Sequence, residues 1–144
     1  MGAKRHETLL YKIAYLSSIL LLVFNGAGAI YGGYGLITHP NGTTIGLDMK
    51  LLAHTPFTDY LVPGIALLLL NGICDFLVLV ATVRKANSFH RYIVAQGMVL
   101  LIWLAIQILL IRTIDQMHFV MGLTGTLMIA SGLAIMALQD KIDA

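Results

Sequence analysis

Four long apolar runs fill almost all of this 144-residue sequence and constrain its fold more than any other feature. Bilayer hydrocarbon is about 30 Å thick, and a helix needs roughly 20 apolar residues to cross it. Since lipid cannot satisfy exposed backbone N–H and C=O groups, each crossing segment must be helical. We predict spans at residues 13–36, 61–83, 92–111 and 119–138, all within one domain covering residues 1–144. The fold class is therefore all-α, an integral membrane four-helix bundle.

The composition supports this prediction and excludes several classes of protein. Charged residues make up 11% of the sequence and hydrophobic residues 58%, so the four spans leave no room for a soluble domain. A basic patch with interleaved aromatic residues is absent, so we expect no nucleic-acid partner. A chain this short has little interior of its own. We therefore expect a homo-oligomer or a partner membrane subunit, in addition to the lipid bilayer.

The distribution of basic residues predicts the orientation of the chain in the membrane. One side carries Lys4, Arg5, Lys12, Arg84, Lys85, Arg91 and Lys141, and the other carries Lys50 and Arg112. A surplus of Lys and Arg in short segments marks the cytoplasmic side. We expect both termini to be cytoplasmic in a multi-pass inner (plasma) membrane protein. Ala27-Gly28-Ala29 resembles a signal-peptide cleavage site, but the apolar run continues to Ile37, which favours a retained span.

The segment between the first two spans is the only long loop, and we expect it to form an ordered outward cap. His39 to Gly42 has the composition of a turn. Residues 45–53 could form a short helix at the membrane interface. Thr55 and Pro56 have the residue types of an N-cap and a first helical position.

Polar and small residues recur at spacings of three and four within each span, which places them on one helix face. Such faces predict a bundle with a polar seam inside. The candidate ligand-binding residues on these faces are Asn25, Asn71, Asp75, Gln96, Trp103 and Gln107.

Asp75 is the main functional candidate. It lies near the middle of the second span, with Asn71 one turn away on the same face. A charged residue at this depth costs at least about 2.5–3.5 kcal/mol on insertion scales, so an intramembrane acid indicates a functional site. By depth, Asn25 and Gln96 are its expected partners. The alternative is a protonated acid in a purely structural hydrogen-bond network, and the sequence leaves both interpretations open.

Trp103 is also unusual, because tryptophan favours the membrane interface and this residue lies near the centre of its span. It is either a core aromatic with a satisfied N–H or part of a pocket for an apolar or cationic ligand.

Small-residue motifs predict close helix contacts. Gly28-x-x-x-Gly32 in the first span and Gly122-x-x-x-Thr126-x-x-x-Ala130 in the fourth have the spacing of membrane helix interfaces. We expect the first and fourth spans to be neighbours, or one of them to be a dimer face.

The segment GGYGLITHPNGTTIGLDMKLLAHTPFTDYLVPG, together with Trp103 and Gln107, resembles a recurring segment of small bacterial four-span membrane proteins. The resemblance covers about the first two-thirds of the chain. It implies four helices and brings no assigned activity.

Three functions remain open at this point. The first is binding or transport of a small lipophilic or amphipathic molecule in a polar intramembrane pocket around Asp75. The second is a non-catalytic accessory subunit that packs through glycine-rich faces. The third is a membrane enzyme acting on a lipid or quinone, which is the weakest because general acid–base work needs an activated partner group. We identify no catalytic residues, no metal site and no cofactor motif, since C-x-x-C, G-x-S-x-G and P-loop patterns are absent.

Overall fold

The computed structural model describes residues 2–143 and is all-α over that range. The helices are α1 (Gly2–Thr38), α2 (Leu61–Leu67), α3 (Cys74–Val83), α4 (Phe89–Ile111) and α5 (Gln116–Asp143). A π-helical segment, η3 (Leu68–Ile73), joins α2 to α3 and makes them one continuous span. Four helical stretches in the described residues are long and apolar enough to cross a membrane. The predicted all-α four-helix bundle is confirmed, and the protein is a multi-pass membrane protein.

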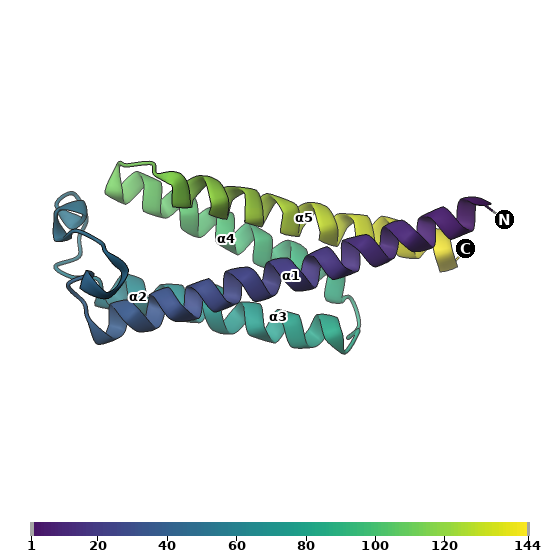
Figure 1. Cartoon of the computed structure of the whole chain (residues 1–144), viewed down its shortest axis with the longest axis horizontal. Helices are drawn as coiled ribbons and strands as arrows, with labels where there is room; N and C mark the ends of the chain where they lie inside the picture. Colours follow the sequence, from purple (N-terminus) through teal and green to yellow (C-terminus); the bar gives the residue numbers. More distant parts are fainter. Residues whose placement is uncertain (1, 144) are drawn as a thin grey trace.

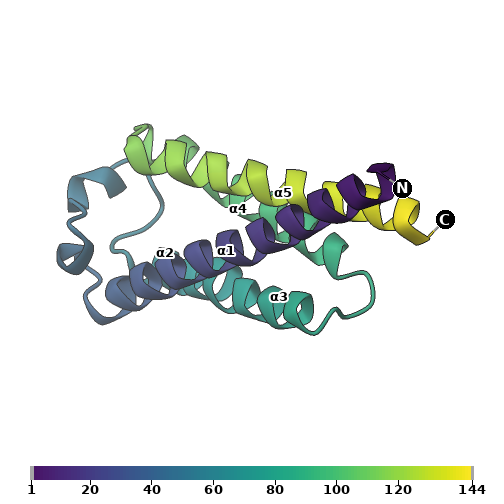
Figure 2. The same ribbon diagram turned by 45° about the vertical axis from the view of Figure 1, so that its right-hand side comes forward.

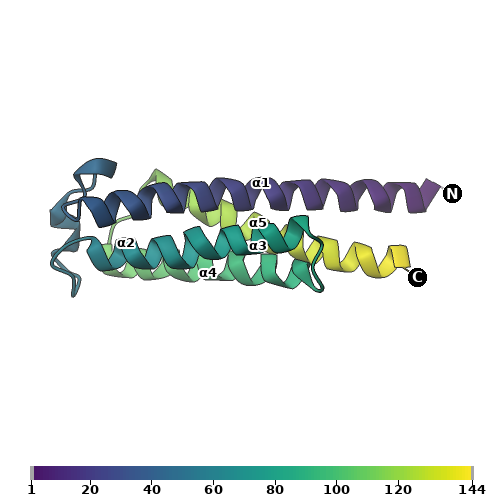
Figure 3. The same cartoon turned by 90° about the horizontal axis from the view of Figure 1, so that it is seen from below.

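Both chain ends lie at one end of the bundle, next to the α3–α4 connection, and residues 39–60 lie at the other end (Figures 1 and 3). The seven basic residues grouped by the sequence therefore lie at the end that carries the termini. α1 has 37 residues, which corresponds to about 55 Å of helix at 1.5 Å per residue. Because the bilayer hydrocarbon is only about 30 Å thick, the N-terminal turns of α1 extend beyond it.

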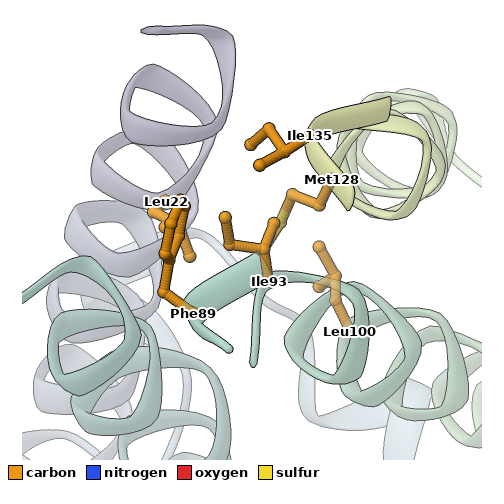
Figure 4. Packing of buried hydrophobic residues seen from close by; sticks show 6 residues of the cluster. All are labelled: Leu22, Phe89, Ile93, Leu100, Met128 and Ile135. Atoms are coloured by element: carbon orange, nitrogen blue, oxygen red, sulfur yellow. The ribbon is translucent and has the colours of Figure 1, made fainter. Parts of the chain in front are cut away.

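α1 is the central helix of the bundle and contacts two of the other three spans extensively. α1 packs against α2, η3 and α3 on one side and against α5 on the other, while α4 packs mainly against α5 (Figure 2). The predicted proximity of the first and fourth spans is confirmed. An apolar core joins α1, α4 and α5 (Figure 4). Its buried members are Leu22, Phe89, Ile93, Leu100, Met128 and Ile135.

Glycines set the closest helix contacts, but they are not the glycines of the predicted motifs. A Cβ on Gly33 would lie 2.8 Å from Leu68 Cβ and 2.9 Å from the Gly64 carbonyl oxygen. A Cβ on Gly97 would lie 2.8 Å from the Gly125 carbonyl oxygen. Backbones this close exclude any larger side chain at these positions.

The predicted motifs meet facing helices only in part, because an added Cβ on Gly32 or Gly122 would make an ordinary contact with one leucine side chain. A Cβ on Gly28 would have nothing within 4 Å, and Thr126 and Ala130 are exposed. Spacing of four identifies a helix face but not its partner. The close contacts use neighbouring glycines on adjacent faces, because those faces meet the facing helices.

The outer loop forms two single-turn 3-10 helices, η1 (Thr43–Ile45) and η2 (Met49–Leu52), in place of the one helix predicted over residues 45–53. Gly46 has φ 71°, a left-handed conformation that interrupts the helix between them. The predicted turn is confirmed, because the Gly42 N–H donates to the His39 carbonyl at 3.0 Å.

The predicted cap at Thr55 is also corrected. Thr55 Oγ1 accepts from the Phe57 N–H at 3.2 Å, which closes a local turn and starts no helix. The helix begins only at Leu61, whose N–H donates to Asp59 Oδ1 at 2.9 Å. Pro63 then falls in the first turn, where its missing N–H leaves no hydrogen bond unmade.

Tyr60 closes the loop onto the bundle. Its N–H donates to the Pro40 carbonyl at 2.8 Å, and its hydroxyl donates to the Asp48 carbonyl at 2.7 Å. Its ring is buried with Leu36 and Leu52 in a small apolar cluster, separate from the main core. The loop is therefore an ordered cap, as the sequence predicts.

Candidate functional site

Four of the six predicted site residues form a buried polar cluster midway along the bundle. Asn71 and Asp75 are completely buried, Asn25 is 1% exposed and Gln96 is 4% exposed. They come from α1, the η3–α3 span and α4. The helical spacing that placed these residues on inward faces is thus confirmed for this group.

The hydrogen bond between Asn25 and Asp75 is the shorter of the two that the cluster makes. Asn25 Nδ2 donates to Asp75 Oδ2 at 2.6 Å. Gly26 makes this approach possible, because a Cβ there would lie 3.1 Å from Asp75 Cβ. A short bond between an amide and a carboxyl ties α1 directly to α3.

The π-helical turn of η3 shapes the same cluster. The Cys74 N–H donates to the Leu69 carbonyl five residues back, as expected for a π-helix. The Leu70 carbonyl accepts a hydrogen bond from Gln96 Nε2 at 2.9 Å. A side chain of α4 thus satisfies a backbone oxygen of the irregular turn. Sequence periodicity missed this turn, because the run LLLLNGIC contains no proline, and its single glycine, Gly72, is of a type that is common in membrane helices.

The cluster has unused hydrogen-bonding capacity. Neither the oxygen nor the nitrogen of the Asn71 amide has a partner, and Asp75 Oδ1 has none either. Buried polar groups are usually paired, so unpaired groups in a native structure need an explanation. No Lys, Arg or His occurs within the four predicted spans, so a charged Asp75 would have no counter-charge at its depth. The neutral acid is the form that suits this environment.

Trp103 and Gln107 lie elsewhere. They line a cavity of about 120 Å³ beneath the outer loop, and none of the four clustered residues lines it. The rest of its wall comes from the end of α1, the loop, α2 and α4, and includes Leu36, Leu52, Phe57, Tyr60, Pro63 and Ala66. Helical spacing groups the six residues into one site, whereas the structure divides them between a buried cluster and a cavity.

The cavity has an apolar wall with a few polar groups. Trp103 Nε1 is buried and has no hydrogen-bond partner. Thr55, Tyr60 and Gln107 also line the cavity and supply further polar atoms. Small-molecule sites are typically apolar with a small number of placed polar groups. The loop residues of this wall were missed, because nothing in the sequence shows that the loop folds over α4.

A further polar contact lies outside the predicted set. Ser18 Oγ donates to Ser131 Oγ at 3.0 Å, and both side chains are buried between α1 and α5. Neither serine is among the six candidate residues selected from the sequence. This contact positions α1 against α5 and has no unpaired atom.

At the outer end of α5, Asp115 and His118 cap the helix reciprocally. The His118 N–H donates to Asp115 Oδ1 at 3.2 Å, and the Asp115 N–H donates to His118 Nδ1 at 3.2 Å. Desolvation acts to raise the pKa of Asp115, but the hydrogen bonds with His118 outweigh it and hold that pKa below its ordinary value. This pair is a helix cap and lies outside both the cluster and the cavity.

Comparison with known proteins adds no assignment. No model of a known protein family matches the sequence, and no solved structure matches the fold.

Proposed function

We propose that the protein binds a small lipophilic or amphipathic molecule in the cavity beneath the outer loop. The observation that carries this proposal is the cavity of about 120 Å³ next to an unpartnered, buried Trp103 N–H. An apolar cavity of about 150 Å³ is enough to hold benzene. The cavity thus suits a small ring or a short alkyl segment, with the rest of the ligand extending outward.

The residues of the cavity have separate roles in this proposal. The leucine and phenylalanine side chains remove the apolar part of the ligand from water or lipid. The Trp103 N–H would donate to an acceptor on the ligand, such as a hydroxyl or carbonyl oxygen. Gln107 lines the cavity, and its side-chain amide can both donate and accept. A ligand with one oxygen-bearing head and a short apolar body fits these groups.

Asp75 supports binding through the packing of the helices and would act directly only in a transport function. Its hydrogen bond to Asn25 holds α1 against α3, and α1 and α2 contribute to the cavity wall. In a transport function, Asp75 would gain or lose a proton as the helices rearrange around the ligand. The unpaired Asn71 amide and Asp75 Oδ1 would supply alternative hydrogen-bond partners for that rearrangement.

Intrinsic fluorescence tests the binding proposal, because Trp103 is the only tryptophan in the chain. The probe is 6-bromohexanol, whose bromine quenches tryptophan and whose hydroxyl can accept from the indole N–H. We expect saturable quenching in the wild type in nanodiscs. Ala66→Leu fills the cavity wall and should abolish the saturable component.

The matched control is Ala105→Leu, an equal change on an exposed face of α4 outside the cavity. It should quench like the wild type. Quenching that rises linearly without saturation, and equally in all three proteins, would mean that the probe reaches Trp103 only through the lipid. That result would end the binding proposal.

A second candidate function is that of an accessory subunit or homo-oligomer. It is favoured by the small residues that remain uncovered, with Gly28 open and Thr126 and Ala130 exposed. Small exposed residues at a spacing of four allow close approach of another helix. Light scattering of the purified protein would measure its oligomeric state, and Gly28→Leu and Ala130→Leu are the variants that should disrupt an oligomer. A monomeric wild type would exclude a homo-oligomer.

We also propose that the protein resides in the plasma membrane with both termini in the cytoplasm. Support comes from the placement of seven of nine Lys and Arg residues at the end that carries the termini. Positive residues in short segments are retained on the cytoplasmic side.

A further inference from the structure

A second cavity lies at the opposite end of the bundle, among the basic residues. It has a volume of about 570 Å³ and opens between α1, α5 and the connection from α3 to α4. Its polar and aromatic lining residues are Thr8, Tyr11, Lys12, Tyr15, Lys85 and Gln139. No Asp or Glu lines it in the described residues, so both charged residues of its lining, Lys12 and Lys85, are basic.

Aromatic rings hold one of these lysines in place. Lys85 Nζ lies 5.6 Å from the centre of the Tyr15 ring, which is within cation–π range. Tyr15 is itself fixed, because its hydroxyl donates to the Thr82 carbonyl at 3.1 Å and its ring stacks on Tyr11. The ammonium group of Lys85, an exposed residue, thus lies over a ring that the fold holds in place.

The backbone at Lys85 is also unusual. Its φ is 49°, in the left-handed region. The Lys85 N–H donates to the Thr82 carbonyl and the Ala86 N–H donates to the Ala81 carbonyl, which together form a Schellman motif at the end of α3. Glycine is the usual residue at this position, because a side chain there is strained. Lys85 shares this backbone conformation with Ser88 and Arg112, and of the three only Lys85 lines this cavity.

Gln139 offers the cavity an unpaired hydrogen-bond acceptor. Its side-chain oxygen is buried and has no hydrogen-bond partner. An unpaired acceptor at the wall of a cavity is suited to a ligand with a hydroxyl donor. The cavity thus combines two cations for an anionic group with one free acceptor for a hydroxyl group.

The geometry points to a binding site for the headgroup of an anionic phospholipid with a hydroxyl donor, such as phosphatidylglycerol. The phosphate would lie between Lys12 and Lys85, and a headgroup hydroxyl would donate to Gln139. The tyrosines mark the level of the membrane interface, where lipid phosphates are found. Anionic lipids attract basic residues at the membrane surface, and here the fold arranges two of them around a cavity.

Native mass spectrometry of the protein released from mixed phosphatidylcholine–phosphatidylglycerol nanodiscs tests this site. We expect the wild type to retain phosphatidylglycerol over phosphatidylcholine. Lys85→Gly and Lys12→Ala should each weaken that preference about fivefold, which corresponds to about 1 kcal/mol per basic residue near the surface. Lys85→Gly also relieves the left-handed strain, so its melting temperature should equal or exceed that of the wild type. Loss of lipid without loss of stability separates a binding role from a structural one.

Arg91→Ala and Lys141→Ala are the controls, because both residues are exposed, lie at the same end and line no part of this cavity. They should retain phosphatidylglycerol like the wild type. Equal losses in all four variants would mean nonspecific attraction and would overturn the proposed site. Should Lys85→Gly fold poorly, Lys85→Asn provides the second test, since asparagine tolerates the same backbone conformation.

The source of the phosphate is tested separately with soluble glycerol 3-phosphate. A lipid site predicts no displacement of phosphatidylglycerol by this compound at millimolar concentration, because the acyl chains contribute to binding. Displacement at that concentration would indicate a site for a free phosphate ester and would overturn the lipid assignment.

Discussion

The side-chain amide of Asn25 on α1 donates a 2.6 Å hydrogen bond to the carboxyl group of Asp75 on α3, deep inside the bundle. No basic side chain occurs within the four predicted spans to neutralise a charged carboxylate. The pair therefore acts as a hydrogen-bonded amide and neutral acid that joins two membrane helices. Neighbouring groups on Asn71 and Asp75 remain unpaired, so the network is not saturated.

The first prediction compares Asp75→Asn with Asp75→Ala. The asparagine can still accept from Asn25, so the free energy of unfolding should change by less than about 1 kcal/mol. The alanine leaves the Asn25 amide buried and unpaired, which costs about 1–3 kcal/mol. Thermal unfolding in detergent measures both, with Cys74→Ala, at the adjacent position outside the cluster, as control. An Asp75→Asn protein as unstable as Asp75→Ala would show that the carboxyl group itself is required.

The second prediction concerns the carbonyl in the π-helical turn. Gln96→Leu removes the donor to the Leu70 carbonyl and should destabilise the protein by about 1–3 kcal/mol, because that oxygen is left unpaired in a buried site. Gln107→Leu is the matched control, since it is the same change on α4 at a residue that lines the cavity and lies outside the buried cluster. Equal melting temperatures for the two variants would contradict the assigned role of Gln96.

The third prediction separates the glycines that pack from those that do not. Gly33→Ala places a Cβ 2.8 Å from Leu68 and should destabilise the bundle by about 1–3 kcal/mol. Gly28→Ala meets nothing within 4 Å and should stabilise the helix by up to about 1 kcal/mol. Unfolding curves of the two single variants measure the difference. A stabilised Gly33→Ala would mean that α1 and α2 are further apart.

The fourth prediction uses the loop residue Tyr60. Burial, with a smaller contribution from the charge of Asp48, raises the pKa of its hydroxyl above the ordinary value. The native state therefore keeps this proton at pH values where the unfolded chain loses it. The resulting stability is present below about pH 10 and is lost as the pH rises further.

Tyr60→Phe tests this directly. The variant lacks the hydrogen bond to the Asp48 carbonyl and should be less stable by about 0.5–1.5 kcal/mol at pH 8. That difference should shrink above pH 10, because only the wild type loses stability there through Tyr60. Denaturant titrations across this range measure it. A difference that stays constant would contradict the raised pKa.

The fifth prediction addresses orientation. In a Cys74→Ser background, Thr44→Cys in the outer loop should react with an impermeant thiol reagent in intact cells. Asn87→Cys in the α3–α4 connection should react only after lysis, because basic residues flank it on the cytoplasmic side. Both positions are exposed, so access to the reagent differs only by membrane side. The reverse labelling pattern would invert the topology.

The sequence by itself determined the number of spans, their approximate limits and the inward direction of Asn25, Asn71, Asp75 and Gln96. It could do so because the bilayer imposes helices on apolar runs and makes an outward polar side chain costly. The second span was predicted at residues 61–83, and the structure places it at Leu61–Val83.

Only the tertiary structure decided which groups meet. Periodicity placed Trp103 and Gln107 on the same kind of face as Asp75, but their depth and the folding of the loop assign them to a different site. The close glycine contacts also depend on which helix faces them. The π-helical turn likewise has a carbonyl that is satisfied by Gln96 from the facing helix α4. A helix face is a local property of the sequence, whereas its partner follows from the packing of segments far apart along the chain.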